Sequence, residues 1–228
     1  MNKSIEKGIS PIEDLPSLQD LAYQAIKASI LTLALTPGEQ ISVSELSEQL
    51  KVSKSPVREA LQRLEREKLV RIVPRTGVFV TEITTREIEE ITEIRSVLIG
   101  LAACRAVENV TEEEIDRATR ILEAGDRALN RNDLEDWLSL NDQFHDWLLQ
   151  VADNLSLRHM LSEIDDYFQR IQILASHRPG EVIESNTEHY AILDAINARN
   201  SEKASKAAIN HITNIGKQAV KCSSNIEE

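Results

Sequence analysis

The amino-acid sequence predicts a mainly α-helical protein in which three helices and a β-hairpin precede an all-α antiparallel bundle of about six helices. Three observations support this fold class. The 228-residue chain contains only seven glycines and six prolines, which disfavours a turn-rich β fold. Long runs of Ala, Leu, Ile, Glu and Arg favour helices. One short segment, residues 69–83, has the β-rich pattern of a hairpin.

We divide the chain into an arm at residues 1–16, an N-terminal domain at 17–83 and a helical domain at 84–228. The arm is polar, contains two prolines and has no hydrophobic periodicity, so we expect it to be flexible. Between residues 17 and 35 apolar residues recur at helical spacing, which predicts the first helix. The sequence "TPGE" that follows indicates a turn.

The second and third helices each have a recognisable start. Ser42 and Glu45 form the pattern of a capping box, and the helix that they begin is expected to end near Lys51. Proline suits the first position of a helix, whereas the residue before it is disfavoured there. We therefore expect Ser55 to cap the third helix and Pro56 to be its first residue. The spacing predicts a buried side formed by Val57, Ala60, Leu61 and Leu64 and an outward side formed by Lys54, Arg58 and Gln62.

The hairpin has two apolar runs around the turn "RTG", and beyond it the chain continues as successive helices separated by short polar breaks. A helical hydrophobic period with short connections is typical of an antiparallel bundle. The expected spans are 85–108, 111–130, 132–152, 154–175, 181–199 and 201–221.

Cysteine usage and hydropathy indicate where the protein acts. Cys104 and Cys222 lie far apart without the spacing of a metal site, which fits a reducing compartment. The start of the sequence has no basic stretch followed by an apolar one, and the central apolar run "VLIGLAAC" is too short to cross a bilayer. We expect a cytoplasmic protein with no membrane partner.

Positive charge is concentrated in residues 51–75, which hold eight basic and three acidic side chains and so carry a local charge of +5, although the whole chain carries −12. Three helices followed by a hairpin are the pattern of a winged helix-turn-helix, whose recognition helix enters the major groove of DNA. A basic helix by itself is more often a solvated surface. Here the caps, the apolar stripe and the hairpin agree, and we predict that this domain binds double-stranded DNA.

The segment "LTPGEQISVSELSEQLKVSKSPVREALQRLEREKLVRIVPRTGVFV" resembles the DNA-binding domain of the GntR family of bacterial transcription regulators. The helical remainder resembles the FCD ligand-binding domain of the FadR-like branch. Together the two resemblances cover nearly the whole chain from about residue 17. They imply DNA contacts at the start of the recognition helix and at the tip of the wing. The residues at these positions are Ser53, Lys54, Ser55, Arg58, Arg75, Thr76 and Gly77.

Two residues depart from the pattern of this family. Lys51 stands where its members usually have a glycine in the turn, which predicts either backbone strain or an additional phosphate contact. Ser44 stands where some members carry an arginine that contacts a base. That base contact is therefore not expected in this chain.

Three of the five histidines lie on the apolar sides of three predicted helices. Asn141 and His145 are four residues apart and share a helix face, and His189 and His211 each lie among aliphatic residues. A single histidine of this kind is more often a hydrogen-bonded core residue than a ligand. Burying several imidazoles together without a shared partner is unfavourable, however, and a divalent Zn, Ni, Fe or Mn ion would supply that partner.

The resemblance to FCD domains implies a metal site with the ligands Asn141, His145, His189 and His211. Asparagine takes the place of the aspartate that is commoner at the first position, so the site has one negative charge fewer. We therefore expect weaker retention of the metal, or a greater dependence on an anionic effector. Asp142 is rotated by about a third of a turn and is the less suitable ligand.

The resemblance also places Arg95 where an arginine can pair with the carboxylate of an effector. An ordinary surface ion pair with Glu90 or Glu93 is the alternative. The family often has a glutamate where this chain has Ile99, and the identity of the effector is therefore not carried over from any relative.

We interpret the chain as a ligand-responsive transcription regulator, in this family most often a repressor. It would bind a palindromic operator as a homodimer and respond to a small carboxylate bound beside the metal. One alternative is a regulator whose effector is the metal ion itself. Another is a helical metallo-hydrolase joined to a DNA-binding module. Against the hydrolase, Asn141 cannot act as a general base, and the helical repeat turns Glu188 away from its neighbour His189.

Overall fold

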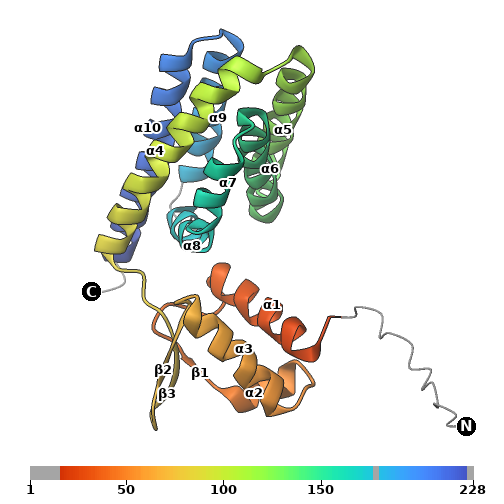
Figure 1. The fold of residues 1–228 in the computed structure, drawn as a ribbon, viewed down its shortest axis with the longest axis vertical. Helices are drawn as coiled ribbons and strands as arrows, with labels where there is room; N and C mark the ends of the chain where they lie inside the picture. Colours follow the sequence, from red (N-terminus) through yellow and green to blue (C-terminus); the bar gives the residue numbers. More distant parts are fainter. Residues whose placement is uncertain (1–15, 177–179, 225–228) are drawn as a thin grey trace, which may run out of the picture. The chain divides into compact units, whose positions relative to one another are not determined.

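The computed structural model describes residues 16–176 and 180–224 (Figure 1). The chain divides into two compact units. The first contains the described residues up to Ile30 together with residues 34–81, and the second contains residues 31–33 and those from Glu82 onward. The arm expected at residues 1–16 lies, apart from Pro16, outside the described residues.

The first unit is the predicted arrangement of three helices and a hairpin. Its sheet is antiparallel with the strand order β1–β3–β2, and Val73 of β2 lies opposite Gly77 of β3. The sequence did not indicate β1, because a strand of two residues is too short to show an alternating pattern. The first helix ends at Leu31, earlier than the predicted end at Leu35. The elements are α1 (Leu18–Leu31), β1 (Gln40–Ile41), α2 (Val43–Gln49), α3 (Lys54–Arg66), β2 (Val70–Val73) and β3 (Gly77–Val80).

The start of α3 differs from the prediction. Ser53 rather than Ser55 is the cap residue, with extended φ and ψ angles of −71° and 167°. Pro56 is therefore the third helical residue instead of the first. Proline is accepted throughout the first turn, because the N–H groups there have no partner within the helix. The buried side of α3 is the predicted one, formed by Val57, Ala60, Leu61 and Leu64.

Several helices end at a left-handed residue that is not glycine. Lys51, after α2, has a φ angle of 54°, and its N–H and that of the next residue bond to carbonyl groups in the last turn of α2. This is the Schellman motif, whose left-handed position is usually a glycine. Lys68 after α3, Asn132 after α5 and Arg199 after α9 have the same conformation. The strain predicted at Lys51 is thus present in the backbone.

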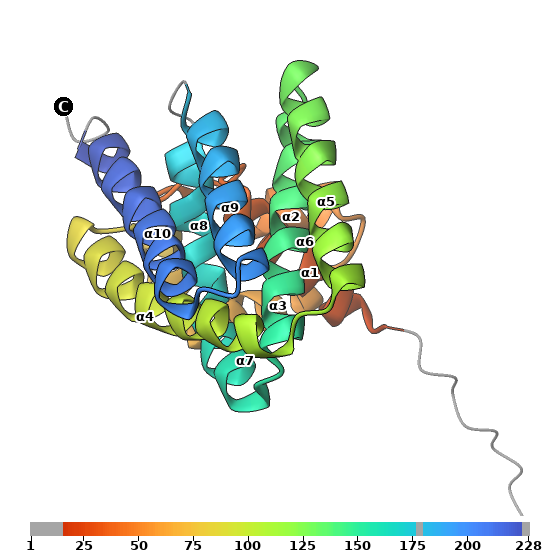
Figure 2. The same ribbon diagram turned by 90° about the horizontal axis from the view of Figure 1, so that it is seen from above.

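The second unit contains seven helices within the described residues. The helix α4 packs mainly against α10 and α6, and α5 packs against α6 and α9 (Figure 2). Side chains such as Ile99, Phe144, Phe168, Ile192 and Ile212 join one continuous apolar core. The elements are α4 (Thr85–Asn109), α5 (Glu112–Asn130), α6 (Leu134–Ala152), α7 (Leu155–Ser162), α8 (Asp165–Ser176), α9 (Glu181–Asn197) and α10 (Ser201–Ser224).

The helix predicted at 154–175 is in fact two helices, α7 and α8, separated by Glu163 and Ile164. Leu161 in α7 and Phe168 in α8 are both buried and lie two helical turns apart in sequence, so the hydrophobic period continues across the break. No glycine or proline stands between them. The break has no local signal in the sequence, which is why six helices were expected rather than seven.

Candidate metal centre and nucleic-acid interface

The outward side of α3 carries basic and hydroxyl side chains at its N-terminal end. Ser53, Lys54, Ser55 and Arg58 are all exposed, so four of the residues predicted to contact DNA lie on one surface. Ser55 Oγ donates to Glu59 Oε1 at 3.1 Å. Arg58 forms no ion pair with any described residue. A cation of this kind at the start of a helix is available to a phosphate or to a base edge.

The wing ends in a tight turn between β2 and β3. The N–H of Thr76 donates to the carbonyl of Val73 at 3.1 Å. Arg75 has a φ angle of 66°, which lies in the left-handed region that tight turns usually fill with glycine or asparagine. Gly77 has a φ angle of 144°, and a Cβ atom there would lie 2.6 Å from Gln40 Nε2. The turn therefore requires glycine at position 77 and presents exposed Arg75 and Thr76 at its tip.

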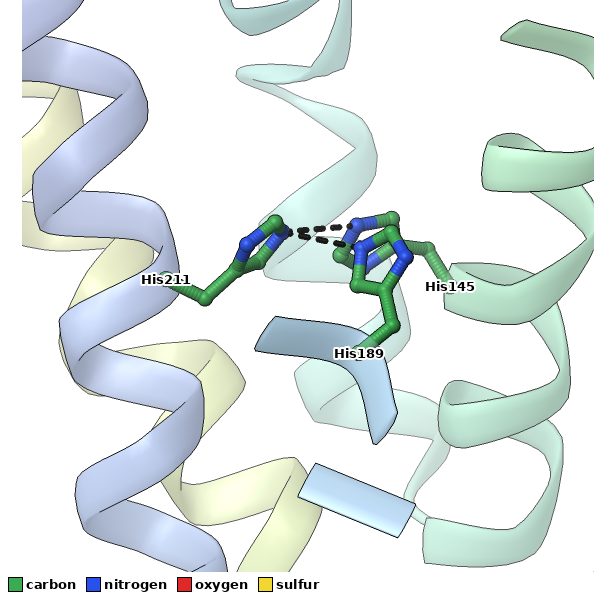
Figure 3. A group of neighbouring side chains, drawn as sticks. All are labelled: His145, His189 and His211. Carbon is green, nitrogen blue, oxygen red and sulfur yellow. Dashed lines mark hydrogen bonds between the residues drawn. The ribbon is translucent and has the colours of Figure 1, made fainter. Parts of the chain in front are cut away.

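Three of the predicted metal ligands meet inside the helical unit. His145 on α6, His189 on α9 and His211 on α10 point toward one another from three different helices (Figure 3). The Nε2 atom of His211 lies 3.1 Å from Nε2 of His189 and 3.3 Å from Nε2 of His145. His189 and His211 are fully buried, and His145 is 7 % exposed. The bundle thus brings together residues that are far apart in sequence.

Burial and one hydrogen bond set the protonation of this cluster. Burial lowers the pKa of His145 and His189 well below its ordinary value, and the proximity of His211 lowers both further. Nδ1 of His211 donates to Glu188 Oε2 at 2.9 Å, because an ionised carboxylate can only accept. This hydrogen bond leaves Nε2 of His211 as the nitrogen that faces the other two rings. Neutral imidazoles with available lone pairs are the form that binds a metal.

The geometry of the cluster fits a divalent metal ion. Two nitrogens that are each about 2.1 Å from one ion lie roughly 3.0–3.4 Å apart in octahedral or tetrahedral coordination, and both Nε2–Nε2 distances fall in this range. No other group of His, Cys, Asp and Glu side chains among the described residues has ligand atoms so arranged. The carboxylate of Glu188 behind His211 also matches the hydrogen bond that a ligating histidine usually makes with its other nitrogen.

Asn141 lies one helical turn before His145 on α6 and is 3 % exposed. Its Nδ2 donates to Asp142 Oδ1 at 3.1 Å, whereas its Oδ1 is buried without a hydrogen-bond partner among the residues that the structure describes. An unpaired buried oxygen is unfavourable, and an amide oxygen is a suitable metal ligand. The side-chain oxygen of Asn141, the residue predicted as the fourth ligand, is therefore in a state to coordinate a metal ion.

Arg95 is buried beside the cluster, and its guanidinium group already has a carboxylate partner. Its Nη1 atom bonds to Asp165 Oδ1, and its Cζ atom lies 4.2 Å from the ring centre of Phe168. The ion pair is thus with α8 rather than with Glu90 or Glu93 on its own helix. A hollow of about 240 Å³ is lined by Arg95, His145, Asp165 and Phe168, among others, so it contains both the arginine and one histidine of the cluster.

Two residues of the site were not predicted from the sequence. Glu188 is turned away from His189, but it faces α10, where its two oxygens accept hydrogen bonds from His211 and Asn214. Asp165 reaches Arg95 from the start of α8. Sequence spacing reveals neighbours on one helix, and both contacts cross between helices. Both oxygens of Glu188 therefore join α9 to α10.

The sequence matches two protein-family profiles. Residues 18–80 match the profile described as bacterial regulatory proteins of the gntR family, and residues 90–214 match the FCD domain. Among the described residues, no helix has both the length and the apolar character that crossing a membrane requires.

Individual relatives cover most of the chain. It is 30 % identical to the HTH-type transcriptional regulator YdhC of Bacillus subtilis strain 168 over 83 % of this chain and 85 % of the relative. It is 25 % identical to the HTH-type transcriptional repressor RspR of Escherichia coli K12 over 93 % and 92 %. The structure of E. coli McbR/YncC has a TM-score of 0.72 and 25 % identity, covering 88 % of this chain and 95 % of that one.

Proposed function

This chain belongs to the GntR family of bacterial transcription regulators and carries an FCD domain, and from that premise we propose that it represses transcription until a small carboxylate binds its FCD domain. Family membership makes it a DNA-binding regulator rather than an enzyme. The repressor sign, the metal, the effector class, the homodimer and action in the cytoplasm are our additions.

The exposed N-terminal end of α3 supports a role as the recognition helix. We assign base reading to Arg58, which projects outward and has no ion-pair partner in the described part of the chain, and phosphate contacts to Ser53, Lys54 and Ser55. Arg75, Thr76 and Gly77 of the wing tip contact the neighbouring backbone or minor groove. Two such units, related by a two-fold axis, match a palindromic operator.

The convergence of three buried Nε2 atoms is the observation that carries the metal proposal. We assign His145, His189 and His211, with the amide oxygen of Asn141, as ligands of a Zn, Ni, Fe or Mn ion. None of the four assigned ligand atoms belongs to a carboxylate or a thiolate, so the ligands themselves do not compensate the charge of the ion. A bound ion would supply positive charge and coordination positions for a carboxylate oxygen. The donor set therefore favours an anionic effector.

Arg95, which lines the hollow, also favours an anionic effector. Its present partner is the carboxylate of Asp165, and an effector carboxylate must compete with that side chain. Asp165 is the first residue of α8, so an effector that displaces it breaks the ion pair between Arg95 and the start of that helix. An effector shifts the DNA-binding equilibrium only by its difference in affinity between the two states, and about 1–3 kcal/mol is typical of such coupling.

Operator selection tests the whole proposal. A pool of random duplexes is enriched on the full-length protein, and affinity for the selected site is then measured on three samples: metal-stripped protein, protein loaded with one metal, and loaded protein with each of a panel of small carboxylic acids. We expect one palindromic consensus, and release by an acid only when metal is present. Release by metal alone would favour the metal-sensing regulator. If none of the three samples yields a preferred site, the assignment of α3 and the wing as the DNA interface is overturned.

A single substitution tests base reading by α3. Arg58→Ala should weaken binding to the selected operator by about 1–3 kcal/mol and leave the affinity for scrambled DNA nearly unchanged. Arg66→Ala, at the exposed C-terminal end of the same helix, is the matched control and should have little effect. Equal losses on operator and scrambled DNA would show that Arg58 contacts only phosphate.

A further inference from the structure

The hollow beside the histidine cluster has a buried floor and an exposed rim. Arg95, His145 and Phe168 are buried and form the floor, whereas Asp142 and Asp146 are exposed and lie at the rim. The proposed function places the carboxylate of the effector at the floor, where the arginine and a metal ligand lie. The side chains of the rim are therefore the ones that meet the remainder of the same molecule.

Two helices each contribute a stripe of polar side chains to this rim. Asp142 and Asp146 are four residues apart on α6, and Asp165, Gln169 and Gln172 follow one another at steps of four and three on α8, so each set lies on one helix face. Asp146, Gln169 and Gln172 have no hydrogen-bond or ion-pair partner in the described part of the chain. These three side chains are thus available to a ligand.

The rim carries negative charge that the hollow does not balance. Arg95 is the only lysine or arginine that lines the hollow within the described residues, and it is paired with Asp165. Asp142 and Asp146 therefore have no balancing cation among the lining residues. An effector with a second carboxylate would bring that group close to these two aspartates, and like charges at short distance repel. The rim thus disfavours a second carboxylate on the effector.

Hydroxyl groups match the rim better than an ammonium group does. An ionised aspartate only accepts hydrogen bonds, whereas a glutamine amide both donates and accepts them. A hydroxyl group also donates and accepts, so a chain of several hydroxyl groups can bond to both kinds of side chain, on α6 and on α8. An ammonium group only donates, and it does so from a single atom. It cannot use the donors of Gln169 and Gln172.

We propose that the effector is a monocarboxylic acid whose carbon chain carries several hydroxyl groups, that is, an aldonic acid, and that Asp146, Gln169 and Gln172 determine this preference. The inference deepens the carboxylate effector of the proposed function and rests on it. The hollow of about 240 Å³ is smaller than the roughly 300–1,000 Å³ of sites for drug-sized ligands, which suits an acid of a few carbon atoms. The carboxylate lies at the floor and the hydroxyl groups lie along the two polar stripes.

The relative affinities of matched acids test this preference. Isothermal titration of the full-length, zinc-loaded protein compares aldonates of four to six carbon atoms, in their different stereoisomers, with three other acids of each chain length. These are the unsubstituted acid, the acid with a terminal ammonium group, and the aldarate, which has a second carboxylate. We expect the tightest aldonate to bind about tenfold or more tightly than each of its three counterparts, because only the aldonate makes the rim hydrogen bonds without charge repulsion.

Two substitutions test the residues that determine the preference. Gln172→Leu should weaken binding of that aldonate by about tenfold and leave binding of the unsubstituted acid unchanged. Gln143→Leu, on the exposed side of α6 and outside the hollow, is the matched control and should change neither affinity. Asp146→Lys reverses a charge of the rim and should raise the affinity for the aldarate relative to the aldonate by about tenfold or more.

The outcomes separate this inference from the proposed function. If none of the acids binds, the carboxylate site of the proposed function is overturned, and the inference with it. If acids bind but the aldonates have no advantage over the unsubstituted, ammonium-bearing or two-carboxylate acids, only the inference is overturned. An aldonate preference that persists unchanged in both Gln172→Leu and Asp146→Lys would overturn the assignment of the rim as its cause.

Discussion

Glu188 on α9 accepts a hydrogen bond from Nδ1 of His211 on α10 at 2.9 Å, which directs Nε2 of that histidine toward the two other histidines of the cluster. The carboxylate therefore selects the tautomer in which His211 can serve as a metal ligand. It also places an acidic side chain directly behind the ring of His211. Glu188 thus acts on the proposed metal site through His211, as a positioning residue.

Replacing this carboxylate should weaken metal binding without unfolding the domain. Glu188→Gln keeps a hydrogen-bond acceptor but removes the charge, and we expect metal affinity to fall by about 10–100-fold. Competition with a chromophoric chelator measures the change. Glu184→Gln, one turn earlier on α9 and exposed, is the control. Equal metal affinity in Glu188→Gln and wild type would contradict the positioning role.

Removing a proposed ligand should abolish metal binding and the effector response together. In His189→Ala we expect the metal content of the purified protein to fall to background and operator affinity to become independent of added acids. Operator affinity without effector should remain, because the DNA-binding unit is separate. His159→Ala, which changes an exposed histidine on α7, is the matched control. Elemental analysis showing a full complement of metal in His189→Ala would refute the ligand assignment.

Asp165→Asn should increase affinity for carboxylates. The substitution removes the internal competitor for Arg95, so the fraction of molecules with an unpaired Arg95 rises and the apparent Kd for a carboxylate falls. If Asp165 pairs with Arg95 in nine-tenths of the molecules, the apparent Kd falls roughly tenfold. Isothermal titration with lactate, malate and citrate measures this. Asp146→Asn removes a charge from the same hollow without touching Arg95. An equal gain in both variants would indicate general electrostatics rather than competition.

Lys51→Gly should stabilise the DNA-binding unit and weaken its binding to DNA. Glycine adopts the left-handed conformation of residue 51 without steric cost, and we expect a gain of up to about 1 kcal/mol in the free energy of unfolding. Loss of the charge should lower the affinity for any duplex. It should also reduce the slope of log affinity against log salt concentration by about one. Thermal unfolding and anisotropy at several salt concentrations measure the two effects. Unchanged salt dependence would show that Lys51 makes no phosphate contact.

The stability of the first unit should depend on the ionisation of Glu67. Burial alone raises the pKa of this carboxyl group, but hydrogen bonds from Tyr23 and Lys27 and the charges of Lys27 and Arg63 outweigh burial and lower it. Because the pKa is lower in the folded state, ionised Glu67 stabilises the fold above its unfolded-state pKa, and this stabilisation is lost as pH falls through the folded-state pKa. The interactions join α1 to α3.

Glu67→Gln should accordingly lower the unfolding temperature at pH 7, and its difference from wild type should shrink below about pH 4. Circular dichroism of the full-length protein follows this transition. Both tryptophans, Trp137 and Trp147, lie in α6 of the other unit, so tryptophan fluorescence should be the same in the two proteins. A difference that grows as the pH falls would contradict the sign of the pKa shift.

Most of the fold could be predicted from local patterns. The hydrophobic period located the helices of the bundle, and it identified the buried side of α3. It also placed His145, His189 and His211 on the apolar sides of their helices, where a bundle must bury them. These features depend on the order of side chains along one element, and the sequence by itself therefore determines them.

Only the tertiary structure decided which side chains meet across elements. The approach of three Nε2 atoms, the hydrogen bond from His211 to Glu188 and the ion pair from Arg95 to Asp165 depend on how helices are rotated and displaced relative to one another. The break between α7 and α8 was also not predictable from local patterns, because Leu161 and Phe168 keep the helical period through it. Rotation and displacement are set by the close packing of the whole core at once, and no single helix carries that information.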